Sequence, residues 1–115
     1  MTIRKANQSD LTQLSKLFDA YRILYQKESD ISGAEKFLKD RLENNESVIF
    51  ITEENNLLLG FVQLYPIFSS TRMKRLWLLN DLYVDEKGRG RGISVLLIDA
   101  CKQHCSETNA CGLTL

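Results

Sequence analysis

A short segment rich in glycine and arginine, Arg89–Ser94 (RGRGIS), most constrains how this chain can fold. It follows the apolar run Leu78–Val84, which is typical of a β-strand, and precedes apolar residues at helical spacing that begin at Ile93. Glycines between a strand and a helix indicate a tight turn, because glycine adopts backbone conformations that other residues resist. The first N–H groups of a helix lack intrahelical partners, and the helix dipole favours negative charge beside them. The segment therefore predicts a site for a phosphorylated, anionic ligand.

Three kinds of phosphate-binding loop can be told apart by sequence. A Walker A loop requires Gly-Lys-Ser or Gly-Lys-Thr, and neither occurs in this chain. A dinucleotide-binding loop requires a third glycine, but the two positions where it would fall hold Ile93 and Val95. The third pattern, R-x-x-G-x-[G/A], fits as Arg89-x-x-Gly92-x-Ser94. Serine replaces the usual glycine or alanine, and because it is small and suits a helix start, we expect the loop to keep its function.

With the Leu-Tyr-Val-Asp strand before it and Leu96-Leu97 after it, this third pattern resembles motif A of the GNAT family of N-acetyltransferases. The order of the expected elements resembles the N-terminal part of that domain, and Gly60–Val62, the strand after it and Trp77–Leu82 resemble the family's central hairpin. The resemblance implies an α+β fold with a GNAT-like three-layer arrangement, in which helices cover both faces of a mostly antiparallel, twisted sheet.

The sequence patterns predict five strands and three helices. Strands are expected at 2–5, 47–52, 57–68, 76–84 and from 112 onward. The first helix is expected to begin at an N-cap, Ser9, and to carry apolar residues inward as far as Leu24 and Tyr25. The second is expected to begin at a capping box formed by Ser32 and Glu35. The third is expected at 93–106, and its inward face is expected to comprise Ile93, Leu96, Leu97, Ala100, Cys101 and Cys105.

The chain is expected to be a single GNAT domain over residues 1–115, truncated at its C-terminal end. In the resembled family the sheet continues with a further helix and strands, so these C-terminal strands are expected to be missing. An uncovered strand edge promotes association. We therefore expect a homodimer, with or without strand exchange.

Composition excludes several function classes. The 115 residues hold 15 Lys and Arg and 15 Asp and Glu, which makes a nucleic-acid partner unexpected, because such proteins carry a basic excess. No apolar run is long enough to span a membrane, and Met1–Gln8 lacks the apolar core of a signal peptide. Three cysteines without a secretion signal are typical of a reducing compartment, so a cytoplasmic location is expected. The basic stretch 72–75 is interpreted as a solvated loop.

The resemblance implies acetyl-CoA as the acetyl donor, with no metal. Its pyrophosphate would lie on the backbone amides of the loop, and its pantetheine arm would pair with the end of the preceding strand, where that strand splays from the next. A backbone N–H there would polarise the thioester carbonyl. The implied cofactor-binding residues are Leu82, Tyr83, Val84, Arg89, Gly90, Arg91, Gly92, Ile93 and Ser94.

The acceptor is expected to be a primary amine, which is protonated at neutral pH and must lose a proton before it attacks. Asp81 is the candidate general base, whereas Asn80 cannot titrate. Tyr21 and Tyr25 either reach the acceptor or pack in the core. Small amines, polyamines, aminoglycosides, amino acids, peptide N-termini and lysine side chains all stay open as acceptors.

Two other functions stay open. The first is a CoA-binding module or inactive fragment that lacks the acceptor half of the site, and the second is a generic nucleotide-binding protein. A zinc site from Cys101, His104, Cys105 and Cys111 is disfavoured, because structural zinc pairs usually come from C-x-x-C loops. These cysteines are interpreted as small buried apolar residues.

Overall fold

A computed structural model describes all residues from Met1 to Leu115. It confirms five strands and three helices, joined by two short 3-10 turns. In chain order the elements are β1 (Thr2–Lys5), η1 (Gln8–Asp10), α1 (Leu11–Leu24), α2 (Ile31–Glu43), β2 (Val48–Glu54), β3 (Leu57–Ser69), β4 (Lys74–Val84), η2 (Glu86–Gly88), α3 (Ile93–Glu107) and β5 (Leu113–Thr114).

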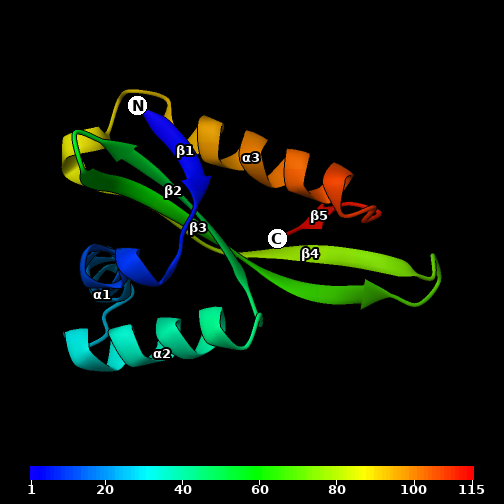
Figure 1. Ribbon diagram of the computed structural model, residues 1–115, viewed down its shortest axis with the longest axis horizontal. Coiled ribbons are helices and arrows are strands. Elements are labelled where there is room, and N and C mark those ends of the chain that lie inside the picture. The colour runs from blue at the N-terminus through cyan, green and yellow to red at the C-terminus, as the bar shows by residue number, and fades with distance from the viewer.

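The strands form one sheet in sequence order, β1-β2-β3-β4-β5. Strands β1 to β4 pair with one another in antiparallel fashion. Strand β5 runs parallel to β4 and pairs only with Trp77 and Leu78. Figure 1 shows α1 and α2 on one face of the sheet and α3 on the other. The fold is therefore the expected three-layer α+β arrangement with a mostly antiparallel sheet.

Each face of the sheet has its own hydrophobic core. Alternate residues of a strand point to opposite faces, so Phe61 packs under α1 and α2 while Val62 packs under α3. The first core comprises Leu11, Leu14, Leu17, Phe18, Ala34, Leu38, Ile49, Ile51, Leu58 and Phe61. The second comprises Phe50, Leu59, Val62, Leu64, Trp77, Ile93, Leu97, Cys101 and Cys105.

A β-bulge interrupts β4 at Asn80. On β3, Gln63 and Leu64 are adjacent, but their partners on β4 are Asp81 and Leu79, so Asn80 is the extra residue. Leu79 and Leu82 consequently pack on the same core although they are three residues apart. Beyond the bulge, simple alternation resumes.

Both expected helix caps are displaced by two residues. The first helical segment is capped by Asn7, not Ser9: the Asn7 side chain accepts from the Ser9 N–H at 2.9 Å, and Asp10 accepts from the Asn7 N–H at 2.8 Å. At α2 the cap is Asp30, whose carboxylate accepts from the Gly33 N–H at 3.0 Å, so the Ser32 capping box is wrong. Asn and Asp are N-caps as good as Ser. In both helices the cap is the candidate that comes earlier in the sequence, Asn7 or Asp30.

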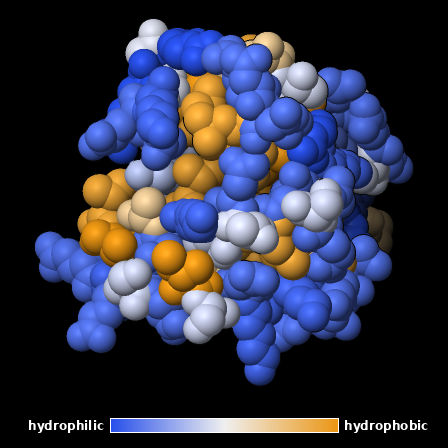
Figure 2. Space-filling model, turned by 60° about the vertical axis from the view of Figure 1, so that its left-hand side comes forward, coloured by the Kyte–Doolittle hydropathy of each residue, from blue (hydrophilic) through white to orange (hydrophobic).

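Three expected inward positions are wrong. Leu24 and Tyr25, at the end of α1, are 63% and 66% exposed, and Leu96 on α3 is 41% exposed. On α3 the buried face includes Ile93 and Leu97, on either side of Leu96 in the sequence. Hydrophilic residues cover most of the face shown in Figure 2, with hydrophobic ones between them in separate patches. No helix is long and apolar enough to cross a lipid bilayer.

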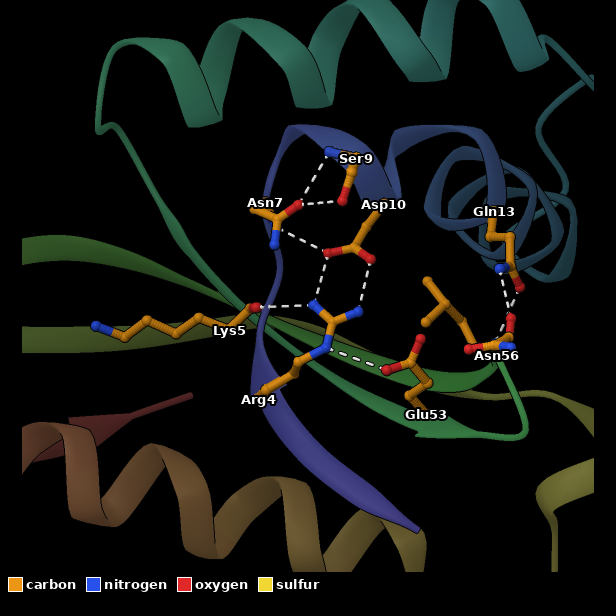
Figure 3. Close-up of polar contacts among 9 residues, drawn as sticks. Arg4, Lys5, Asn7, Ser9, Asp10, Gln13, Glu53 and Asn56 are labelled. Carbon is orange, nitrogen blue, oxygen red and sulfur yellow. Dashed lines mark hydrogen bonds and ion pairs between the residues drawn. The ribbon is translucent and has the colours of Figure 1, made fainter.

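An arginine clamp joins β1, η1 and β2. The Arg4 guanidinium donates twice to Asp10, at 2.8 Å each, and its Nε donates to Glu53 at 3.2 Å (Figure 3). Gln13 of α1 holds the β2–β3 turn in a similar way, because it donates to the Asn56 carbonyl at 2.8 Å and accepts from the Leu58 N–H at 3.0 Å. These contacts hold η1 and the start of α1 against the sheet.

Candidate functional site

The loop between η2 and α3 adopts the conformation that only its glycines favour. Gly90 has φ +78° and Gly92 has φ +74°, both in the left-handed region. A Cβ at either position would have no atom within 4 Å, so the glycines are required by the backbone conformation rather than by crowding. The loop therefore turns sharply and leaves open space in front of its main chain.

Most backbone N–H groups of this loop and of the start of α3 have no partner within the protein; the Arg89 N–H, which donates to the Glu86 carbonyl at 3.3 Å, is an exception. None of the six from Gly90 to Val95 donates to a backbone carbonyl, and the first bond of α3 joins the Leu96 N–H to the Gly92 carbonyl at 3.2 Å. Gly92 precedes α3 without a side-chain cap. Unpartnered N–H groups and the positive end of a helix dipole favour an anion, which is the kind of ligand that the sequence predicts for this loop.

The adjoining edge of β4 carries free backbone groups as well. The Asp85 N–H donates to the Leu59 carbonyl at 2.8 Å, and the register pairs Tyr83 with Phe61. Because bonded and non-bonded pairs alternate along an antiparallel ladder, Leu82 and Val84 direct their N–H and C=O groups away from β3. No strand pairs with Leu82 or Val84 on that side. An extended ligand can therefore pair with this edge as an added strand does.

The two loop arginines are held by different partners. Arg91 forms a bidentate ion pair with Glu54 at the end of β2, at 3.0 and 2.6 Å. The hydrogen bonds from Arg91 lower the pKa of Glu54. Arg89 donates from Nε to the Val84 carbonyl at 3.1 Å, and its guanidinium lies 6.0 Å from the centre of the Tyr83 ring. The nearby Lys87 lines a hollow of about 310 Å³ on the α1 side of the sheet.

Asp81 lies on the face covered by α1 and α2 and is 7% exposed. Its Oδ2 accepts from the Gln63 Nε2 at 2.9 Å, and its Oδ1 accepts from the Asn80 Nδ2 at 3.1 Å. Two donors on one carboxyl group match an ionised carboxylate, which can only accept. The bulge at Asn80 precedes Asp81, so side chains alternate regularly from Asp81 to Val84. The Asp81 side chain therefore points to the face of the sheet opposite to that of Leu82 and Val84.

Two tyrosines lie near this carboxylate. Burial raises the pKa of Tyr21 well above its usual range, and the negative charge of Asp81 raises it further. Burial and the same charge raise the pKa of Tyr65 on β3. Tyr21 packs against Tyr83 at 6.2 Å and against Tyr25 at 5.1 Å, measured between ring centres. Tyr21 thus packs against the first core, whereas Tyr25 is exposed.

Sequence reasoning missed two further polar residues of this cluster. Gln63 is fully buried on β3, and Ser47 just before β2 donates from its hydroxyl to the Gln63 Oε1 at 2.8 Å. A glutamine within the apolar run Leu57–Phe68 was the available signal, because a buried polar side chain requires a partner. The partner itself lies 18 residues away and depends on the register of β3 with β4.

The cysteines and the histidine of α3 lie in the second core. Cys101, His104 and Cys105 are buried, and burial raises the pKa of Cys101 to about 12 and lowers that of His104. Nowhere in the chain do three or more His, Cys, Asp or Glu side chains gather closely enough to hold a metal ion. His104 packs against Trp77 with ring centres 4.7 Å apart.

Comparison with known proteins agrees with this geometry. The family model described as "Acetyltransferase (GNAT) family" matches residues 13–115. An uncharacterized N-acetyltransferase, YhfO of Bacillus subtilis (strain 168), is 50% identical over all of this chain and 77% of its own length. A crystal structure of a probable acetyltransferase is 42% identical with a TM-score of 0.92, over 98% of this chain and 77% of that one.

A more distant crystal structure shares the fold. It is described as a predicted acetyltransferase with acetyl-CoA from Clostridium acetobutylicum, and it is 24% identical with a TM-score of 0.81. The match covers 99% of this chain and 79% of that one.

Proposed function

Since the chain belongs to the GNAT family of acetyltransferases, we propose that it moves an acetyl group from acetyl-CoA to a primary amine by direct attack within a ternary complex. One observation carries this proposal. The six unpartnered N–H groups from Gly90 to Val95 lie directly after a strand edge where no strand pairs with Leu82 or Val84, and where only the Val84 carbonyl has a partner, the Arg89 side chain. A ligand with a diphosphate at one end and an extended amide chain beside it suits both features.

The diphosphate of CoA would lie on the loop. Backbone amides at the start of α3 bind phosphate oxygens without any side chain, and the positive end of the helix stabilises their charge. The residues proposed for this contact are Arg89, Gly90, Arg91, Gly92, Ile93 and Ser94. The distant Clostridium acetobutylicum relative, described with acetyl-CoA, supports this choice of ligand.

The pantetheine arm would pair with Leu82, Tyr83 and Val84. The Leu82 N–H points away from β3, and we assign it the thioester oxygen. A well-placed backbone donor stabilises the oxyanion of the tetrahedral intermediate by roughly 3–4 kcal/mol. The Val84 carbonyl now accepts from Arg89 at 3.1 Å, so this side chain would release the carbonyl when the arm binds.

Asp81 would act as general base. The acceptor amine is protonated at neutral pH, and an ionised carboxylate beside it can take one of its protons. The free amine nitrogen then attacks the thioester carbon, a C–N bond forms, and the C–S bond breaks. The attacking nitrogen, which is positively charged after attack, gives up a second proton, and the departing CoA thiolate takes it up, so the products are the amide and CoA. No covalent enzyme intermediate is needed.

Thiol release from acetyl-CoA tests this function directly. The chain would be assayed with spermidine, an aminoglycoside, free lysine and a lysine-containing peptide, and CoA binding would be measured in parallel. Turnover with any of these amines supports the proposal, and Asp81→Asn should then lower kcat by about 100-fold or more. CoA binding without turnover would favour a CoA-binding module instead.

A further inference from the structure

We propose that Gln63, which accepts a hydrogen bond from Ser47, is a positioning residue that holds the Asp81 carboxylate in place for the acceptor amine. This inference rests on the proposed function, because it gives Asp81 its catalytic role. It concerns two buried side chains on β3 and before β2, neither of which lies on the loop or on the free edge of β4.

The three side chains form one chain of hydrogen bonds across the sheet. Ser47 Oγ donates to Gln63 Oε1 at 2.8 Å, and Gln63 Nε2 donates to Asp81 Oδ2 at 2.9 Å. Gln63 is fully buried, and Ser47 and Asp81 are each 7% exposed. The contacts join residues from three neighbouring strands or their ends, so the sheet itself sets their spacing.

The direction of the Gln63 amide follows from its two partners. An ionised carboxylate only accepts hydrogen bonds, so it requires the NH₂ end of the amide, and the Oε1 end then turns toward Ser47. A serine hydroxyl can donate to that oxygen. The Asp81 carboxylate therefore selects this orientation of Gln63, and the Ser47 hydroxyl satisfies the amide oxygen in it.

Asp81 keeps capacity for a substrate proton in this arrangement. Gln63 occupies one site on Oδ2 and Asn80 occupies one on Oδ1, whereas a carboxylate offers about four lone-pair sites. Two of the groups that face it from neighbouring elements are Tyr21 of α1 and Tyr65 of β3. Neither tyrosine ionises near neutral pH, since both pKa values are raised above the ordinary value for tyrosine.

The two hydrogen bonds, to Ser47 and to Asp81, offset the free-energy cost of burying the Gln63 amide. This amide lies among apolar residues of β3, where an unpartnered amide would cost about 1–3 kcal/mol. A leucine or methionine would avoid that cost if packing were the only requirement. The retained amide supports a role in holding Asp81.

The hydrogen bond can be tested without any substrate. In ¹⁵N-labelled protein, the Gln63 side-chain NH₂ signals should exchange slowly with water, and Asp81→Leu, which removes the acceptor, should shift them and speed their exchange. Unchanged Gln63 signals in a folded Asp81→Leu protein would overturn the inference. This readout is independent of turnover, so it separates a failure of the inference from a failure of the proposed acetyl transfer.

The catalytic consequence is tested by a double-mutant cycle with acetyl-CoA and spermidine. Gln63→Met should lower kcat about tenfold or more while KM for acetyl-CoA changes less than about twofold. In an Asp81→Asn background the same substitution should cost nothing further, since the two residues act as one unit. Equal losses in both backgrounds, or a change in acetyl-CoA KM alone, would contradict a positioning role.

Ser47 supplies a milder variant should Gln63→Met fold poorly. Ser47→Ala should lower kcat about threefold, and Ser47→Thr should restore it, because threonine returns the hydroxyl. Thr52→Val is the matched control. It removes a fully buried hydroxyl from the neighbouring β2 strand that has no hydrogen-bond partner, so kcat should stay unchanged.

A wild-type chain that binds CoA yet transfers no acetyl group to any amine would overturn the proposed function. Protected Gln63 signals in that chain would still establish the hydrogen bond, whereas Asp81 would lose its catalytic role and the positioning inference would fall with it. Acetyl transfer that Gln63→Met and Ser47→Ala leave unchanged would overturn the inference alone.

Discussion

Arg91 of the glycine loop and Glu54 at the end of β2 form a bidentate ion pair, with their nitrogen and oxygen atoms 3.0 and 2.6 Å apart. The pair joins residues 37 positions apart in sequence and connects the loop to the β2–β3 turn at one end of the sheet (Figure 1). Both side chains are partly exposed, so the pair contributes little to stability. It does place a carboxylate beside the proposed diphosphate site.

Glu54→Gln should strengthen CoA binding. Removing this carboxylate leaves the charge of Arg91 uncompensated next to an anionic ligand, and we expect affinity to rise about threefold at low salt and to return to the wild-type value near 0.5 M salt. Calorimetric titration with CoA at two salt concentrations measures this. Glu43→Gln is the control, since it removes an equal charge from an exposed pair on α2. Weaker CoA binding in Glu54→Gln would show that the pair positions Arg91 instead.

Arg4→Met should destabilise the fold by about 1–3 kcal/mol at pH 7, because it leaves the buried Asp10 carboxylate without its charged partner. Hydrogen bonds from Arg4 lower the pKa of Asp10 below its ordinary value of 3.8. The stabilisation is therefore present above about pH 4 and is lost as the pH falls through the folded-state pKa. Urea unfolding at pH 7 and pH 3 should show the difference between wild type and variant narrowing at acid pH. A constant difference would contradict the clamp.

The single histidine, His104, should give the folding stability a second pH dependence. His104 is buried with neither ring nitrogen hydrogen-bonded, and burial, together with the charge of Lys5, lowers its pKa below the ordinary 6.5, against a smaller opposing effect of Glu107. The folded state therefore resists protonation, so stability should fall as the pH drops below about 6.5. His104→Phe should remove this slope between pH 7 and 5.5, as measured by urea midpoints. A parallel fall in both proteins would assign the slope to other groups.

Local patterns predicted most of this fold. Alternating apolar residues located the strands, and Gly90 and Gly92 located the loop, because these signals depend only on neighbouring residues. The N-caps failed at Ser9 and Ser32, where Asn7 and Asp30 were equally suitable and earlier in the chain. Sequence alone ranks such adjacent candidates poorly, since the packing of the preceding segment decides between them.

Sequence also predicted one part of the candidate site and missed the other. The loop and the end of β4 are contiguous in sequence and were predicted, whereas the partners of Asp81 were not. The contact of Asp81 with Gln63 requires both the β3–β4 register and the bulge at Asn80. A shift of register by one residue would move Gln63 to the other face of the sheet. No local pattern specifies such a pairing.

The central claim is that main-chain amides around Gly92 bind the diphosphate of CoA, and Gly92→Glu tests it most directly. The site has open space for a side chain, so the substitution costs the fold only about 1–2 kcal/mol for its left-handed conformation. Gly112→Glu, at a glycine whose nearest neighbour would lie 3.9 Å from an added Cβ, is the control. Calorimetry should show CoA affinity lowered at least about 100-fold in Gly92→Glu and unchanged in Gly112→Glu. Unchanged CoA affinity in a folded Gly92→Glu protein would contradict the account.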